Sequence, residues 1–194
     1  IKVFSDGLDD DHNGYTDDVA GWDFFKNDND PFDDTDYGHG TGEAKTVAAA
    51  GNDGYGEIGD CPDCMVVPLR VGDSFIARSN DFAKGLLYAV DADYGNGQKV
   101  RAVMEALGAL DNSALARRAL DYAHDRGFVV MASAADENSR HHNLPNTNNH
   151  TLTVHAVMHN GSSPSTSTSF LAFNNCTNYG GQLELSLSGA SCSS

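Results

Sequence analysis

A histidine between two glycines is the residue that its neighbours best suit for chemistry. His39 lies in the segment YGHGTG at 37–42, directly before a run of helix-forming residues. The amide groups at the start of a helix carry partial positive charge, which favours the uncharged imidazole that a general base requires. The glycines let a peptide backbone approach closely. His39 is therefore a candidate general base, and an ordinary histidine in a helix-capping turn remains the alternative.

A second candidate site lies in an Asp-rich stretch. Residues 1–36 hold twelve Asp and two Lys, a local charge of −10 within a total of −16. Short carboxylates concentrated in loops are typical of calcium sites. The spacing follows the first nine positions of a calcium-binding loop, with candidate ligands Asp9, Asp11, Asn13, Tyr15 through its carbonyl, and Asp17. Ala20 stands where such a loop needs a bidentate Glu, so Asp18 or a distant residue would complete the shell. A solvated turn-rich loop is the alternative.

Four cysteines, Cys61, Cys64, Cys176 and Cys192, suit two disulfides in an exported protein. Three pairings are possible, and we expect Cys61–Cys64 with Cys176–Cys192. A zinc site is less favoured because only the first two cysteines form a CxxC pair.

Composition argues against a membrane-spanning protein and against a nucleic-acid-binding protein. No apolar run approaches the roughly 20 residues needed to span a bilayer. The acidic balance, with a pI near 4.5, argues against nucleic acid as a partner. A length of 194 residues fits a single domain, 1–194, and we expect a secreted or extracytoplasmic monomer whose targeting signal lies outside the chain.

The elements that would position these residues follow from hydrophobic spacing. We expect a helix at 41–50 capped by Thr41, with Glu43 in its first turn, and a buried strand at 65–71. A second helix, capped by Ser79, would bury Phe82, Leu86 and Val90. A third, opened by Ser113 and ended by Gly127, would carry Leu115, Ala119 and Tyr122 on one face. Further strands are expected at 19–25, 100–107, 128–134, 151–157 and 183–187.

In order and spacing, these segments resemble the subtilisin-like serine peptidases (subtilases). The resemblance is carried by His-Gly-Thr at 39–41, CMVVPLRV, VRAVMEALG, VVMASAADEN, TLTVHAV and the final SLSGASCSS. It implies an α/β fold with a doubly wound, mostly parallel sheet covered by helices on both faces, here truncated at both ends. It also implies a Ser-His-Asp triad that hydrolyses protein or peptide substrates through an acyl-enzyme.

The resemblance assigns roles position by position. His39 falls on the triad histidine, and Ser194 aligns with the nucleophile, where it is equally open to being a loop serine. Ala106, Leu107 and Gly108 fall on the strand that pairs with the substrate backbone. Asp136 takes the place of the oxyanion-binding Asn, so it would have to be protonated to donate, or else the enzyme is slow.

The triad carboxylate has no clear position in the chain. We expect it upstream of Ile1, with Asp6 as the less favoured alternative because Asp6-Gly7 lacks the intervening Ser or Thr. The chain by itself is therefore expected to be inactive. Two other interpretations stay open: a catalytically weak or dead binding module of the same fold, and an unrelated calcium-binding adhesion-type domain.

Overall fold

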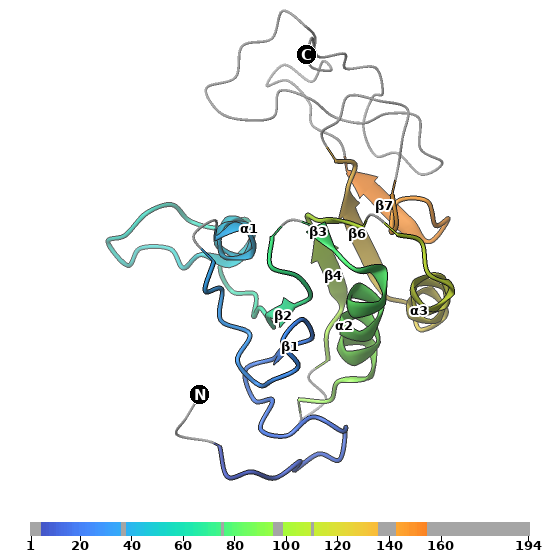
Figure 1. Ribbon diagram of the computed structural model, residues 1–194. Helices are drawn as coiled ribbons and strands as arrows, with labels where there is room; N and C mark the ends of the chain where they lie inside the picture. The colour runs from blue at the N-terminus through green and yellow to red at the C-terminus, as the bar shows by residue number, and fades with distance from the viewer. Residues whose placement is uncertain are drawn as a thin grey trace, which may run out of the picture. The chain divides into compact units, whose positions relative to one another are not determined.

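The computed structural model describes residues 5–35, 38–74, 76–94, 99–109, 111–135 and 143–154 (Figure 1). Contacts between residues divide the chain into two compact units, Ile1–Ala77 and Arg78–Ser194. Each unit is described by itself. In the described residues, no helix is long and apolar enough to cross a membrane.

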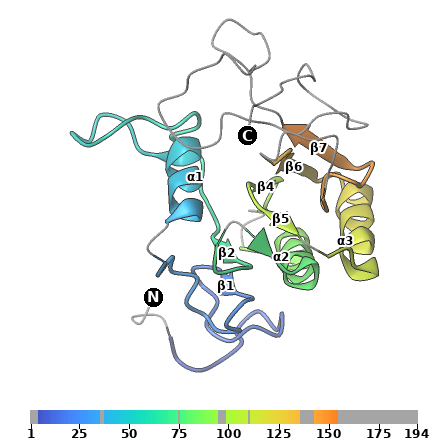
Figure 2. The ribbon, with the colours of Figure 1, turned by 45° about the horizontal axis from the view of Figure 1, so that its top comes forward.

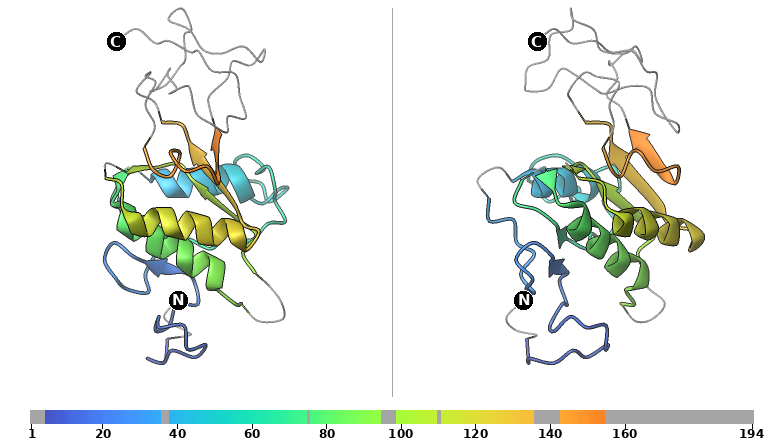
Figure 3. Two further views of the ribbon diagram at one scale, coloured as in Figure 1. Left: turned by 90° about the vertical axis from the view of Figure 1, so that its right-hand side faces the viewer. Right: turned by 45° about the vertical axis from the view of Figure 1, so that its right-hand side comes forward.

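The second unit is an α/β layer built on a parallel sheet. Strands β4 (Ala102–Glu105), β6 (Val129–Ser133) and β7 (Thr151–Val154) form a parallel sheet in the order β4-β6-β7. Helix α2 (Ser79–Asp91) precedes β4, the short strand β5 (Gly108–Ala109) follows it, and α3 (Ala114–Asp125) leads into β6. Helices α2 and α3 pack side by side (Figure 3). The predicted alternation of helices and parallel strands is confirmed.

The two helices meet through an apolar core that periodicity predicted well for α2 and less well for α3. Phe82, Leu86 and Val90 are buried, as their four-residue spacing predicts. On α3 the predicted face of Leu115, Ala119 and Tyr122 is only partly buried: Ala119 is buried, whereas the Leu115 side chain is 41% exposed. The buried stripe of α3 is Ala116, Ala119, Leu120 and Ala123. This stripe has helical spacing and is mostly small, which lets the two helices approach closely.

One face of the sheet is buried and the other is more open. Side chains alternate across a strand, and Val130 and Ala132 of β6 are buried together with Thr151 and Thr153 of β7. On the opposite face, Met104, Val129 and Val154 remain between 42% and 46% exposed. The expected cover of both faces is therefore not seen within the described part of this unit.

The starts of α2 and α3 are capped in different ways. Ser113 caps α3, as predicted, by accepting a hydrogen bond of 3.0 Å from the Ala116 N–H. Ser79 does not cap α2, whose N-cap is Arg78. Instead the Ser79 hydroxyl donates to Asp111 Oδ2 at 2.7 Å, and this bond lowers the pKa of the Asp111 carboxyl. Gly127, with a φ of 76°, follows α3 as predicted.

The first unit holds less regular structure. Its elements are β1 (Trp22–Asp23), α1 (His39–Ala48), β2 (Leu69–Arg70) and β3 (Ile76–Ala77), and β1 pairs with β2 in parallel. The predicted strand at 19–25 is confined to β1. The predicted buried strand at 65–71 is wrong in its first half, where Met65 is 85% exposed. Strand β2 is as short as β1, and the register pairs Trp22 with Leu69 and Asp23 with Arg70.

Candidate functional site

His39 is the first residue of α1, not a residue that precedes it. The helix begins two residues earlier than predicted, and its N-cap is Gly38 in the left-handed region at φ 61°, where glycine is unstrained. The prediction that Thr41 caps the helix, with Glu43 in the first turn, is therefore wrong. Because Gly38 supplies the turn, the half-buried His39 stands in the first turn of α1, at the end of the helix where backbone N–H groups carry partial positive charge.

Sequence reasoning missed Asp33, which binds the start of this helix. Thr41 donates to Asp33 Oδ2 through its hydroxyl at 2.9 Å and through its N–H at 3.3 Å. The hydroxyl of Thr35 donates to Asp33 Oδ1 at 2.8 Å. The Thr35 hydroxyl first, and then Thr41, hold the pKa of the Asp33 carboxyl below its usual range despite some burial. The Asp33 carboxylate thus stands at the positive end of α1, bound to Thr41, which is two residues after His39. The available signal was an Asp and a Thr at alternate positions just upstream of the His.

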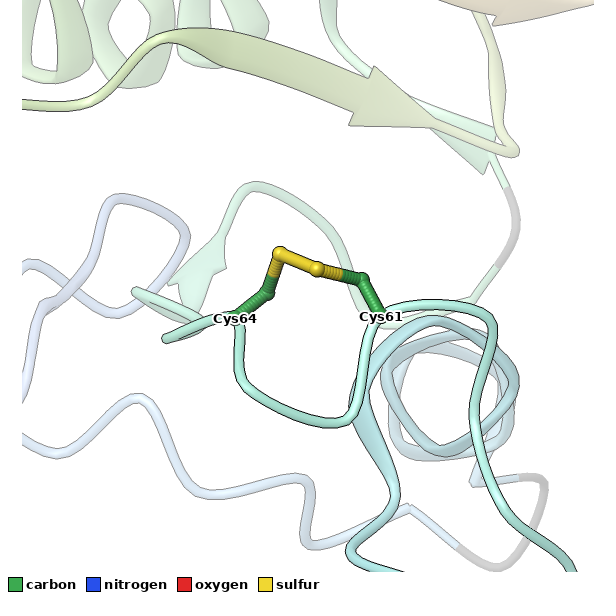
Figure 4. Close-up of a disulfide and its surroundings, with 2 residues drawn as sticks. All are labelled: Cys61 and Cys64. Carbon is green, nitrogen blue, oxygen red and sulfur yellow. A yellow bond between two sulfur atoms is a disulfide. The ribbon is translucent and has the colours of Figure 1, made fainter.

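The other end of α1 is held by the segment that follows it. The N–H groups of Gly59, Asp60 and Cys61 donate to the carbonyls of Ala49, Thr46 and Val47 at 2.8–3.0 Å. A Cβ at Gly59 would lie 2.5–2.8 Å from the helix backbone, so only glycine allows this approach. Directly after it, Cys61 and Cys64 are joined by a disulfide (Figure 4). Since α1 buries none of its own residues, hydrogen bonds at its two ends fix the helix within its unit.

The predicted substrate strand lies in the second unit. Ala106, Leu107 and Gly108 are half-buried and follow β4 directly. The Leu107 N–H donates to Oε2 of Glu105 at 3.0 Å. Glu105 is only 7% exposed, and burial raises the pKa of its carboxyl well above the usual range, an effect that the Leu107 N–H reduces. Sequence reasoning did not single out Glu105.

The Asp-rich loop folds back on itself. Oδ1 and Oδ2 of Asp9 accept hydrogen bonds from the N–H groups of Asn13 and Gly14, and Asp11 and Asp18 accept from the Asn13 side-chain amide. The pKa of Asp11 is raised overall. Burial is the largest cause, the Asn13 N–H opposes it, and the neighbouring carboxylates of Asp18 and Asp9 add to it. The ring of Tyr15 packs edge-on against Trp22 and Phe24.

The five candidate ligands are only partly brought together. Asp9, Asp11 and Asn13 share one network, whereas Asp17 turns away and accepts from the N–H groups of Asp6 and Gly7. No group of three or more His, Cys, Asp or Glu side chains placed to hold a metal ion occurs among the described residues. The oxygen donors still fit calcium by chemistry, because carboxylate, amide and carbonyl oxygens are its ligands.

The remaining predicted site residues lie outside the described residues. They are Asp136, Ser194, the second cysteine pair Cys176 and Cys192, and the strand at 183–187. His39 belongs to the first unit, where it begins α1. Ala106, Leu107 and Gly108 belong to the second unit, where they lead from β4 into β5; Figure 2 labels these three elements.

Comparison with known proteins identifies relatives along most of the chain. A sequence model of the Subtilase family (Peptidase S8) matches residues 2–190. Thermitase of Thermoactinomyces vulgaris is 30% identical over 151 residues, which are 77% of this chain and 51% of thermitase. Subtilisin-like protease 1 of Plasmodium vivax is 38% identical over 85 residues, 43% of this chain and 13% of that protein. This chain therefore spans about half the length of thermitase, and less of the Plasmodium protein.

The fold has matching solved structures. A mutant of the protease domain of PatA superposes with a TM-score of 0.63 at 17% identity, over 80% of this chain and 54% of that one. At this identity the similarity shows a shared fold alone. A psychrophilic protease gives a TM-score of 0.50 at 26% identity over 58% of this chain and 37% of that one.

Proposed function

Because the chain belongs to the Subtilase family, we propose that it carries part of the catalytic domain of a serine endopeptidase, with His39 as the general base. The observation that carries this proposal is the position of His39, in the first turn of α1 within the matched range 2–190. His39 would accept the proton of the attacking serine, for which Ser194 is the candidate, and the resulting acyl-enzyme would be hydrolysed by water.

The proposal includes a carboxylate that orients the imidazole. We place it upstream of Ile1, with Asp6 as the second candidate. The Asp6 N–H donates to Asp17 at 2.8 Å, and the Asp6 carboxylate accepts from the Leu8 N–H at 2.9 Å. The upstream position rests on the sequence, in which Asp6-Gly7 lacks the intervening Ser or Thr. By the same proposal the 194-residue chain alone should not cleave casein.

The test is His39→Ala in the full-length protein. Removing a triad member should lower kcat by about 10⁴-fold or more, because the serine then lacks its base. Labelling by a serine-directed fluorophosphonate should fall with it. His124→Gln is the matched control, since His124 is exposed on α3 in the other unit, and it should leave both readouts unchanged. Full hydrolysis by His39→Ala would refute the proposal.

A catalytically weak or dead binding module is the second candidate function, favoured by Asp136 at the oxyanion position. If Asp136 is ionised and slows the enzyme, Asp136→Asn should raise kcat by about 10²–10³-fold, the usual value of one oxyanion donor. If Asp136 acts as a protonated donor, the same change should leave kcat nearly unaltered. A parent protein that neither labels nor hydrolyses, with or without Asn at 136, would favour the binding module.

We also propose that the protein is secreted or extracytoplasmic and that the loop at 9–18 binds a structural calcium ion. The ligands would be Asp9, Asp11, Asn13, the Tyr15 carbonyl and Asp17, with Asp18 or a distant residue completing the shell. Calcium would compete with the backbone N–H groups of Asn13 and Gly14 that now hold Asp9. Such an ion would rigidify the loop and would take no part in the peptidase chemistry.

Calcium binding is tested by thermal unfolding. Calcium at 100 times its Kd should stabilise the folded protein by about 2.7 kcal/mol, and magnesium at the same concentration by less. Asp9→Asn combined with Asp11→Asn should remove the calcium effect. Asp63→Asn, in an exposed loop without a predicted ligand role, should retain it. An unchanged calcium response in the double variant would exclude this loop as the site.

A further inference from the structure

Glu105 is an acid on the apolar side of the sheet. In the parallel register it stands beside Ala132, and Val103 stands beside Val130. Paired residues share a face, so Glu105 projects to the same side as Val103, Val130 and Ala132, the side covered by the helices. Burying a carboxyl group there costs free energy unless its oxygens are hydrogen-bonded or it keeps its proton.

The carboxyl group has one hydrogen bond and one unpaired oxygen. Oε2 accepts from the Leu107 N–H at 3.0 Å, whereas Oε1 is buried and lacks a hydrogen-bond partner among the described residues. The raised pKa of Glu105 comes from burial and is reduced by that one N–H; within the described ranges no charged side chain contributes to it. The neighbouring residues on β6, Ala132 and Ser133, carry no charge. Burial therefore shifts the Glu105 carboxyl group toward its protonated form.

The hydrogen bond falls at a place that matters for the proposed function. Leu107 is the central residue of the predicted substrate strand, between the end of β4 and the start of β5. Successive N–H groups of an extended chain point in opposite directions. Because Glu105 binds the Leu107 N–H, it sets the side toward which the backbone groups of Ala106 and Gly108 face.

We propose that Glu105 is a positioning residue, whose carboxyl group holds residues 106–108 in the conformation that pairs with a peptide substrate. This inference rests on the proposed peptidase function. The effect of Glu105 should be confined to substrates long enough to pair with that strand, and it should need a hydrogen-bond acceptor at this position and not a charge as such.

The test compares two substrates in the full-length protein: a chromogenic amide with four residues before the scissile bond, and an ester of a single acylated amino acid. Glu105→Met removes the acceptor at similar volume, and it should raise KM for the tetrapeptide about tenfold, the value of one hydrogen bond. Its kcat/KM for the ester should change less than twofold. Glu105→Gln keeps an uncharged carbonyl acceptor and should restore the tetrapeptide KM.

Val103→Ala is the matched control, since it removes apolar volume from the same face of β4 and leaves the Leu107 hydrogen bond intact. It should lower stability without changing the ratio of the two substrates. An unchanged ratio in Glu105→Met, or an equal loss in Glu105→Gln, would overturn the inference. If His39-dependent hydrolysis is absent for both substrates, the proposed function itself fails.

A pH profile covers the case in which Glu105→Met does not fold. An acid whose folded pKa is raised stabilises the fold below its unfolded pKa, and that contribution is lost as pH rises through the folded pKa. Rising pH should therefore lower stability, whereas the tetrapeptide KM values of the wild type and of Glu105→Gln should change in parallel, because an ionised carboxylate still accepts from the Leu107 N–H. A rise in the wild-type KM that Glu105→Gln does not share would overturn the inference.

Discussion

The two units of this chain are stabilised in different ways. In the second unit, α2 carries nine buried residues, and an apolar cluster joins α2, α3 and β6. In the first unit, α1 carries none, and long loops are tied by hydrogen bonds that backbone N–H groups donate to Asp carboxylates. Apolar packing is non-directional, whereas hydrogen bonds and ion pairs require particular partners. The first unit should therefore be the more sensitive to single polar substitutions.

Arg70 is the centre of the polar unit. Its side chain is 8% exposed. Nη1 lies 3.3 Å from Asp23 Oδ2 and 2.7 Å from Asp34 Oδ1, and Nη2 lies 2.9 Å from Asp73 Oδ1. Burial lowers the pKa of the guanidinium, but the carboxylates of Asp23, Asp34 and Asp73 outweigh burial and raise it overall. Asp23 is fully buried and also accepts from the N–H groups of Phe25 and Lys26. Arg70 thus pairs a charge that the unit could not otherwise bury.

The largest expected effect is that of Arg70→Met. It would leave Asp23 buried without its cation and should lower the free energy of unfolding by about 3–5 kcal/mol. Trp22, the sole tryptophan and the neighbour of Asp23, reports on this unit by fluorescence during urea unfolding. Arg78→Met is the control in the second unit, followed by far-UV circular dichroism because Trp22 does not belong to that unit. Arg78 pairs with Asp81 but its side chain is 72% exposed, so the loss should be less than about 1 kcal/mol. Equal effects would remove the contrast between the units.

The matching substitution in the apolar unit is Leu120→Ala. Leu120 is fully buried on α3, so its truncation should cost about 2–5 kcal/mol through lost burial and a cavity. Leu115→Ala, on the exposed side of the same helix, should stay within about 0.5 kcal/mol. Far-UV circular dichroism during unfolding measures both. A large loss in Leu115→Ala would mean that this face of α3 is covered in the whole protein.

The same contrast explains what could be predicted from the sequence. Periodicity places α2, α3 and the parallel strands, because apolar burial repeats with the period of each element. It fails for α1, whose start depends on Gly38 and on Asp33, a residue eight positions before Thr41. The ion pairs of Arg70, the bond from Ser79 to Asp111 and the bond from Leu107 to Glu105 leave no periodic signal. Of the features of the candidate site, the motif at 39–41 could be predicted from the sequence, because it resembles that of a known family.

The smallest expected effects compare the two helix caps. Ser113 caps α3 with an uncharged hydroxyl, so Ser113→Ala should cost about 1 kcal/mol at every pH. Asp33 binds the start of α1 as an anion with a lowered pKa. Such a group stabilises the fold above the unfolded Asp pKa of about 3.9, and this contribution is lost as pH falls through its folded pKa. Asp33→Ala should therefore destabilise the first unit near neutral pH and cease to matter in acid. Hydrogen exchange at the Thr41 N–H, followed from neutral to acidic pH, measures this directly, and a pH-independent loss would show that Asp33 does not act through its charge.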